Sequence, residues 1–164
     1  VLADSTPEPL NQVNLGKVAE ALKKLAAHAQ AHQVMLLVET NGYFANSANM
    51  LALMEAAASD AVAVLWDIHH PYRFFNEPVD KTYGNLKKYI RYVHLKDSLR
   101  GDDGKVTYQM MGYGDLPVIQ AIDLLKADKF TGYLSMEWLK RWRRDLAEPG
   151  IVLPHYLNYI KKLL

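Results

Sequence analysis

The stretch AVAVLWD, residues 61–67, is a short apolar run that ends abruptly in an aspartate. Successive apolar residues rich in valine predict a strand that is covered on both faces, as in a parallel sheet. Three other stretches have the same character: VMLLVET at 34–40, YIRYVHLKD at 89–97 and YLSMEW at 133–138. The sequence therefore predicts four strands of one parallel sheet.

Amphipathic helices are predicted between these strands. The first begins at Leu15, with Asn14 as N-cap, and ends near His32; the next follows Asn46 or Ser47. A short helix is expected around 82–88 and another from Asp115, whose carboxylate would cap it. The last is expected from about Pro154, with Leu157, Ile160 and Leu164 on one face. Strict alternation of strands and helices favours βαβ units, so the predicted class is α/β.

Composition limits the kind of protein this can be. The 164 residues are half apolar, so we expect residues 1–164 to form a single domain. Nineteen basic residues against eighteen acidic ones give a net charge of +1, which favours neither nucleic acid nor an anionic membrane as a partner. The sequence has no cysteine, which excludes thiolate metal sites and favours a reducing compartment.

Membrane and export signals are not apparent in the sequence. No apolar run approaches the roughly 20 residues needed to cross a bilayer, and no stretch resembles a signal peptide. We therefore expect a cytoplasmic protein. Because the first residue is Val1 and not a methionine, we also expect the sequence to be part of a longer product.

Each predicted strand carries an oxygen or imidazole ligand near its carboxyl end. These residues are Glu39, Asp67, His94 and Glu137. In parallel α/β folds, binding and catalysis take place at that edge of the sheet. Any one of them would be an ordinary polar residue at a strand end, but carboxylates buried side by side are costly without a cation between them. Three carboxylates and one imidazole favour Mn, Mg or Co, with Zn less typical.

Side-chain alternation extends this set. Tyr92, His94 and Lys96 share one face of the third strand, so Lys96 is a candidate substrate-binding residue; a lysine reaching from the mouth of the site to solvent is the alternative. His69, by the same alternation, is expected to face outward. The basic run KRWRRD, 140–145, could contact a phosphate or nucleic acid, but a solvated loop is the commoner explanation.

Five motifs together resemble the xylose isomerase-like TIM barrel superfamily, in particular its sugar phosphate isomerase/epimerase group. They are LLVETN, LWDIHHPYRF, RYVHLKDSLR, MGYGDLPV and GYLSMEWLKRW, in the family's order. The resemblance implies that Glu39, Asp67, His94 and Glu137 are the metal ligands. It also implies that Glu39 and Glu137 act as acid and base on opposite faces of a sugar.

The resemblance further implies that His70 and Arg100 hold the substrate oxygen beside the metal. A metal that chelates a carbonyl and the neighbouring hydroxyl would stabilise the enediolate formed when a C–H proton is removed. The implied activity is isomerisation or epimerisation of a small sugar, a polyol or their phosphates.

Length sets this chain apart from the family. A full barrel runs to roughly 250 residues, whereas this chain supplies about four βα units. We therefore expect the C-terminal half of a (β/α)8 TIM barrel, with the four strands as the fifth to eighth of the barrel. The missing N-terminal half would belong to a longer protein, or a second chain or a homo-oligomer would complete the sheet, because open sheet edges favour aggregation. Activity of this segment alone is therefore doubtful.

The same residues are compatible with other functions. A metal-dependent dehydratase of the inosose or dehydroshikimate kind would use the same first step, and HLKD with Lys96 is compatible with it. A non-catalytic barrel fragment that binds metal or sugar is a second alternative. The endonuclease IV type is disfavoured, because the loop GDDGKVTYQMMGYGD has no histidine to complete a multi-metal cluster.

Overall fold

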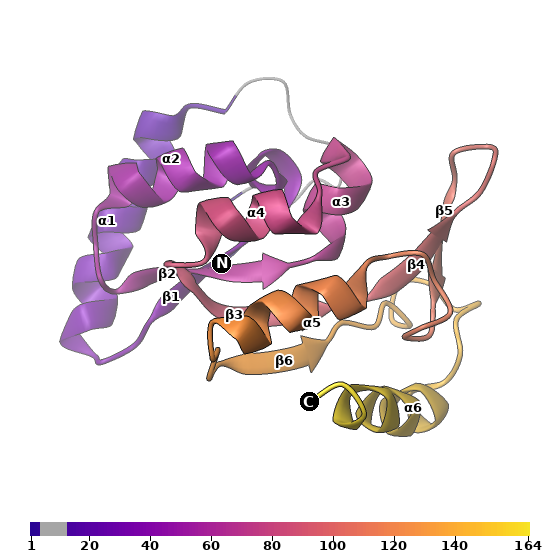
Figure 1. Cartoon of the computed structure of the whole chain (residues 1–164). Coiled ribbons are helices and arrows are strands. Elements are labelled where there is room, and N and C mark those ends of the chain that lie inside the picture. The colour runs from indigo at the N-terminus through magenta and orange to yellow at the C-terminus, as the bar shows by residue number, and fades with distance from the viewer. Residues whose placement is uncertain (4–12) are drawn as a thin grey trace.

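A computed structural model describes residues 1–3 and 13–164. Its centre is a four-stranded parallel sheet in the order β1-β2-β3-β6, built from β1 (Leu36–Glu39), β2 (Val62–Asp67), β3 (Ile90–Leu95) and β6 (Tyr133–Met136) (Figure 1). The predicted α/β class and the four predicted strands are confirmed. The first strand is shorter than expected, because Val34 and Met35 precede it and are exposed.

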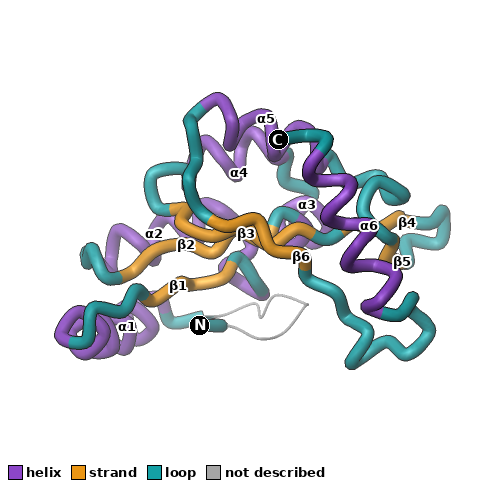
Figure 2. Tube along the Cα trace, turned by 90° about the horizontal axis from the view of Figure 1, so that it is seen from below, coloured by secondary structure: helices purple, strands orange, loops and turns teal. Residues whose placement is uncertain are grey.

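Helices cover one face of the sheet. The packed row runs α1 (Leu15–Ala31), α2 (Ser47–Ala57), α4 (Val79–Leu86) and α5 (Val118–Ala127), each helix against the next, and Figure 2 shows α2, α4 and α5 on the same side of the strands. Asn14 and Asn46 cap α1 and α2 as predicted, since their side-chain oxygens accept backbone N–H groups of the first turn. Val38, Val64 and Trp66 face these helices and are completely buried.

The opposite face of the sheet carries the candidate ligands and is only partly covered. Leu65, Tyr92 and Tyr133 are aligned across three strands on this face. Leu65 and Tyr92 are half-buried, and Tyr133 is 74% exposed. In the described residues, helices therefore cover one face of the sheet, and the other face is partly exposed to solvent.

Backbone groups at the outer edge of β1 are paired by the first residue of the chain. The amino group of Val1 donates to Leu37 O at 2.7 Å, and Glu39 N donates to Val1 O at 3.1 Å. This is the bonding pattern of a parallel neighbour. β6 forms the other end of the sheet.

Several elements were not predicted. The segment after Asp67, for which the sequence predicted no helix, contains α3 (His69–Phe75), with Pro71 in its first turn. A 3-10 helix, η1 (Gly42–Ala45), precedes α2. After β3 the chain forms an antiparallel hairpin of β4 (Asp97–Arg100) and β5 (Val106–Gln109), whose turn is the GDDG sequence.

Two predicted helix starts were wrong. α5 begins at Val118, and Asp115 does not cap it, because the Asp115 carboxylate pairs with Arg73. The final helix, α6 (Pro149–Lys161), begins earlier than Pro154, which lies inside it. Its buried face is made by Val152, Tyr156 and Ile160, whereas Leu157 and Leu164, expected on one face with Ile160, are exposed.

Candidate metal centre

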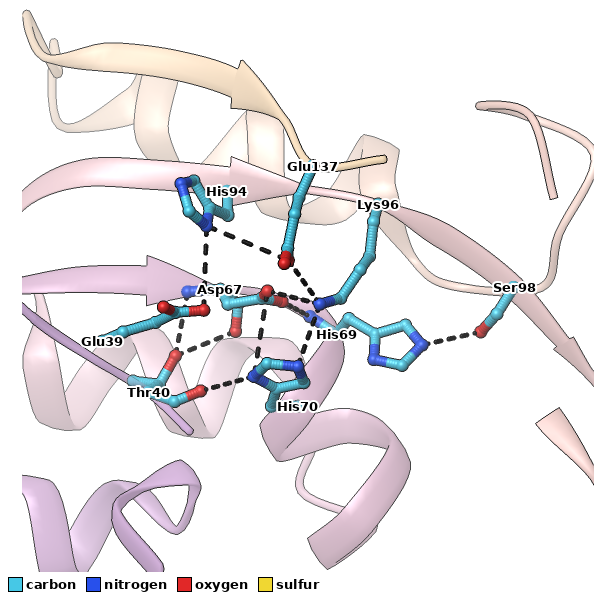
Figure 3. Close-up of polar contacts among 9 residues, drawn as sticks. All are labelled: Glu39, Thr40, Asp67, His69, His70, His94, Lys96, Ser98 and Glu137. Carbon is cyan, nitrogen blue, oxygen red and sulfur yellow. Dashed lines mark hydrogen bonds and ion pairs between the residues drawn. The ribbon is translucent and has the colours of Figure 1, made fainter. Parts of the chain in front are cut away.

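The four predicted ligands converge at the carboxyl edge of the sheet. Glu39 and Asp67 end β1 and β2, His94 lies near the end of β3, and Glu137 directly follows β6. One ligand atom from each lies within 4.8 Å of the others (Figure 3). The sheet pairing positions them: Asp67 is opposite His94, and Glu137 N donates to Leu95 O at 3.0 Å, which extends the pairing of β6 with β3 to the ligand.

His94 provides the clearest sign that a cation would fit between these groups. Its Nδ1 lies 3.7 Å from Oε1 of Glu39 and 3.9 Å from Oε2 of Glu137, so the three atoms face one another at more than hydrogen-bond distance. The same buried nitrogen has no hydrogen-bond partner among the described residues. Burial alone would lower the pKa of His94, but the carboxylates around it outweigh burial and raise it.

Asp67 is the most deeply buried ligand, with no exposed surface. Its Oδ1 accepts the backbone N–H of His69 at 2.8 Å. Burial acts to raise the pKa of this carboxyl group, but its electrostatic interactions with His70 and with the ammonium of Lys96 outweigh burial and hold the pKa well below its usual range. Asp67 is therefore an ionised, fixed carboxylate.

Lys96 lies inside the cluster and does not reach solvent. Its side chain is 3% exposed, and Nζ lies 2.9 Å from Oδ2 of Asp67 and 2.5 Å from Oε2 of Glu137. Burial would lower the pKa of this ammonium, but the two carboxylates raise it above its usual range. Burial also raises the pKa of Glu137, although the charge of Lys96 opposes this shift.

His70 stands next to Lys96 with both ring nitrogens engaged. Nε2 lies 2.9 Å from Lys96 Nζ, and Nδ1 lies 2.9 Å from the backbone oxygen of Thr40. Because an ammonium can only donate, Nε2 accepts and Nδ1 donates to the carbonyl, which fixes the tautomer. Burial lowers the pKa of His70, so the ring is neutral. In this arrangement the histidine orients Lys96.

His69 was predicted to face outward, and this is wrong. The ring is completely buried, with Nε2 3.1 Å from Ser98 Oγ, and it stacks on Tyr108 of β5. Burial, assisted by the charge of Lys96, lowers its pKa to about 2. The alternation rule fails because the strand ends at Asp67 and α3 begins at His69.

Arg100 is not brought to the cluster. It lies in β4, which pairs with β5 and is not part of the four-stranded sheet, and its guanidinium donates to the backbone oxygen of Arg73. Its side chain lines a pocket with Tyr72, Asn76 and Pro117. The predicted partnership of Arg100 with His70 is therefore not formed in this structure.

Sequence reasoning missed two supporting residues. Thr40 Oγ1 accepts the N–H of Asp67 at 2.8 Å and donates to its carbonyl at 3.0 Å, so it locks the backbone of a ligand. Ser98 Oγ, which contacts His69, also accepts Arg73 Nε at 2.7 Å and so joins the hairpin to α3. Thr40 directly follows the ligand Glu39, which was a usable signal, but no pattern in the sequence marks Ser98.

The sequence and the fold both match known proteins. A family model described as a xylose isomerase-like TIM barrel matches residues 2–156. No protein of curated function matches the chain significantly. No helix in the described part of the chain has both the length and the apolar character needed to cross a membrane.

Solved structures match the chain over nearly its whole length. An L-ribulose 3-epimerase is 23% identical, with a TM-score of 0.78; the match covers 96% of this chain and 56% of the epimerase chain. A D-allulose 3-epimerase from Methylomonas sp. is 17% identical, with a TM-score of 0.79, over 98% and 59%. A xylose isomerase-like TIM barrel protein from Mycobacterium smegmatis, solved in complex with magnesium, is 19% identical, with a TM-score of 0.73, over 95% and 53%. The chain spans a little over half the length of each.

Proposed function

Because the chain belongs to the xylose isomerase-like TIM barrel family, we propose that it forms the metal-binding half of a divalent-metal-dependent sugar isomerase or epimerase. Its substrate would be a small sugar, a polyol or a phosphate of either. The observation that carries the proposal is the convergence of four ligand atoms from four adjacent strands within 4.8 Å. Two solved structures with this fold are sugar 3-epimerases, which supports the reaction class.

Glu39, Asp67, His94 and Glu137 would hold the metal. Three carboxylates and one imidazole suit Mn, Mg or Co better than Zn, and the partnerless Nδ1 of His94 facing two carboxylates fits a cation between them. A cation held there supplies a Lewis acid for the substrate oxygen that gains charge when the neighbouring C–H is deprotonated.

The protein's own residues would move the protons. Glu39 and Glu137 come from β1 and β6, the two ends of the sheet, and so approach a bound sugar from different sides. One carboxylate would take the C–H proton and the other would return a proton to the opposite face. The raised pKa of Glu137 makes its protonated form accessible and suits it to the donor role.

Lys96 would supply positive charge to the developing oxyanion, with His70 fixing its ammonium. This is the role that the resemblance assigns to His70 and Arg100. Arg100 would take part only if the β4–β5 hairpin released its side chain from the carbonyl oxygen of Arg73.

Dehydration is the second candidate, and the buried Lys96 is the observation that favours it. An ammonium held between two ligand carboxylates could donate a proton to a departing hydroxyl group after the same C–H deprotonation. A panel of ketoses and inososes separates the two reactions, because only dehydration yields a product that has lost water.

The test uses the complete protein that contains this chain, loaded with Mn²⁺, Mg²⁺ or Co²⁺ and freed of excess metal. We expect a bound divalent ion by elemental analysis and exchange of a substrate C–H for solvent deuterium by NMR. Glu137→Gln should weaken metal binding and abolish exchange, while Glu55→Gln, on the exposed surface of α2, should change neither. A metal-supplemented preparation with no bound ion and no exchange would overturn the proposal.

A further inference from the structure

A basic loop, residues 138–148, directly follows the ligand Glu137 and connects β6 to α6. In Figure 2 the chain leaves β6 toward the side of the sheet opposite α4 and α5. Side-chain alternation places the ligands on that same face, because Trp66, next to Asp67, faces the helices. The loop has four basic residues, Lys140, Arg141, Arg143 and Arg144, against two acidic ones, Asp145 and Glu148. Loops that follow the strands of such folds form the rim of the site.

Internal hydrogen bonds close the base of this loop. The indole N–H of Trp138 donates to Ala147 O at 2.9 Å. The ammonium of Lys140 donates to Arg144 O and Leu146 O, both at 2.8 Å, and pairs with Glu148 at 2.7 Å. Lys140 is thus used to fold the loop, which presents residues 141–145 as a defined tip.

The tip exposes cationic groups that have no anionic partner. Arg143 is neutralised by Asp145 at 3.0 Å. Arg141 and Arg144 are exposed and form no ion pair with any described residue. The ring of Trp142 is 73% exposed, with the Arg141 guanidinium 5.0 Å from its centre. An arginine stacked on an indole keeps its N–H groups free along the edge of the guanidinium plane.

The loop also lies within reach of a ligand held at the metal centre. Arg141 is the fourth residue after Glu137, so their Cα atoms are at most about 14 Å apart even in a fully extended chain. A small phosphorylated sugar together with an arginine side chain spans a gap of this order. The net charge of only +1 for the whole chain argues against a nucleic acid as the partner of this loop.

We propose that Arg141 and Arg144 bind the phosphate group of the substrate, so that the sugar acted on at the metal centre is a sugar phosphate. Guanidinium groups match phosphate oxygens in pairs of charge-assisted hydrogen bonds. Trp142 provides an apolar surface beside them for the carbon skeleton of the sugar. The inference rests on the proposed function for its substrate, while phosphate binding by the loop stands independently of it.

The first experiment measures phosphate binding without catalysis. The complete protein is titrated with inorganic phosphate at constant ionic strength, by calorimetry and by the fluorescence of exposed Trp142. Arg141→Gln/Arg144→Gln should weaken binding at least tenfold. The matched double variant Lys23→Gln/Lys24→Gln, which removes the same charge from the exposed surface of α1, should bind as the unmodified protein does. Equal binding by both variants, or no saturable binding by the unmodified protein, would overturn the proposal.

The second experiment compares deuterium exchange into a ketose and into its phosphate. The arginine double variant should raise the KM for the ketose phosphate at least tenfold and leave the kcat and KM for the free ketose unchanged. If both ketoses exchange equally well in the unmodified protein, the phosphate proposal fails while the proposed function stands. If the loop binds phosphate but neither ketose nor inosose exchanges deuterium, the proposed function fails while the phosphate site stands.

Discussion

The ammonium of Lys96 lies 2.9 Å from Oδ2 of Asp67, in a site where neither side chain is more than 3% exposed. A fixed internal cation is thus built into the group of carboxylates that would bind the metal. Its charge offsets part of the repulsion among those carboxylates, and its position between Asp67 and His70 opposes binding of a second metal ion at that pair.

Lys96→Met should therefore destabilise the metal-free protein strongly. Removing one partner of a buried ion pair leaves an uncompensated charge, and the expected loss is about 3–5 kcal/mol in the free energy of unfolding. Urea unfolding in the presence of a chelator measures this loss of stability, and added Mn²⁺ should recover part of it. The control Lys105→Met, at a highly exposed lysine, should lose less than about 0.5 kcal/mol. Equal unfolding of the two variants would show that Lys96 is not the counter-ion.

Thr40→Val should loosen Asp67 while leaving every ligand in place. The substitution removes two buried hydrogen bonds to the Asp67 backbone and should cost about 1–3 kcal/mol of stability. Since residues that orient ligands contribute strongly to affinity, metal binding should weaken about tenfold or more by calorimetry. Thr131→Val, at an exposed position before β6, serves as the matched control. An unchanged metal affinity would contradict the bracing role of Thr40.

Gly114→Ala and Gly84→Ala should have opposite effects. A Cβ at residue 114 would lie 1.9 Å from Oδ1 of Asp97, the carboxylate that accepts the N–H groups of Gly112 and Gly114. We expect this variant to lose more than about 2 kcal/mol, because the loop must move or Asp97 must lose its partners. At Gly84, on the exposed side of α4, a Cβ meets no atom within 4 Å, and alanine should stabilise by about 0.5–1 kcal/mol. Thermal unfolding should show a lower Tm for Gly114→Ala and a higher Tm for Gly84→Ala.

Acid should destabilise the metal-free protein through His69. The pKa of this ring is about 2 in the folded protein and near 6.5 when unfolded, so below pH 6.5 the unfolded chain binds the extra proton. The contribution of His69 to the free energy of unfolding is therefore complete above pH 6.5. Below pH 6.5 it falls by about 1.4 kcal/mol for each pH unit. Urea unfolding at pH 7.5 and pH 5.5 should show this fall in the free energy of unfolding. In His69→Gln the fall should be smaller, because about one proton fewer is taken up on unfolding. Equal slopes would mean that the histidine is already charged in the fold.

The positions of the ligands could be predicted from the sequence for a simple reason. Parallel strands bring their carboxyl ends to one edge, so Glu39 and Asp67 had to lie near each other once the strands were recognised. The face of Lys96 followed from the same alternation, but its burial did not, because that depends on the carboxylates of Asp67 and Glu137 closing around the ammonium.

Elements that depend on tertiary contacts were not predictable. α3 has no N-capping side chain, and its His69 ring stacks on Tyr108 of the hairpin. The helix thus depends on a tertiary contact, and HHPYRFF showed no local helix signal. Asp115 looked like a helix cap because its spacing to the next apolar residues was right. Arg73, distant in sequence, takes its carboxylate instead. Side-chain contacts across the fold thus overrode local preference in both segments.

All four candidate ligands lie at the carboxyl ends of adjacent strands of a single sheet, between residues 39 and 137. The ligands of the proposed metal centre therefore all come from a segment of about 100 residues. A different set of strands joined along the β1 and β6 edges could alter which sugar is recognised without rebuilding the metal centre. In directed recombination, this chain would carry the proposed metal ligands and the proposed phosphate-binding loop, and the joined half would supply the rest of the sugar-binding pocket.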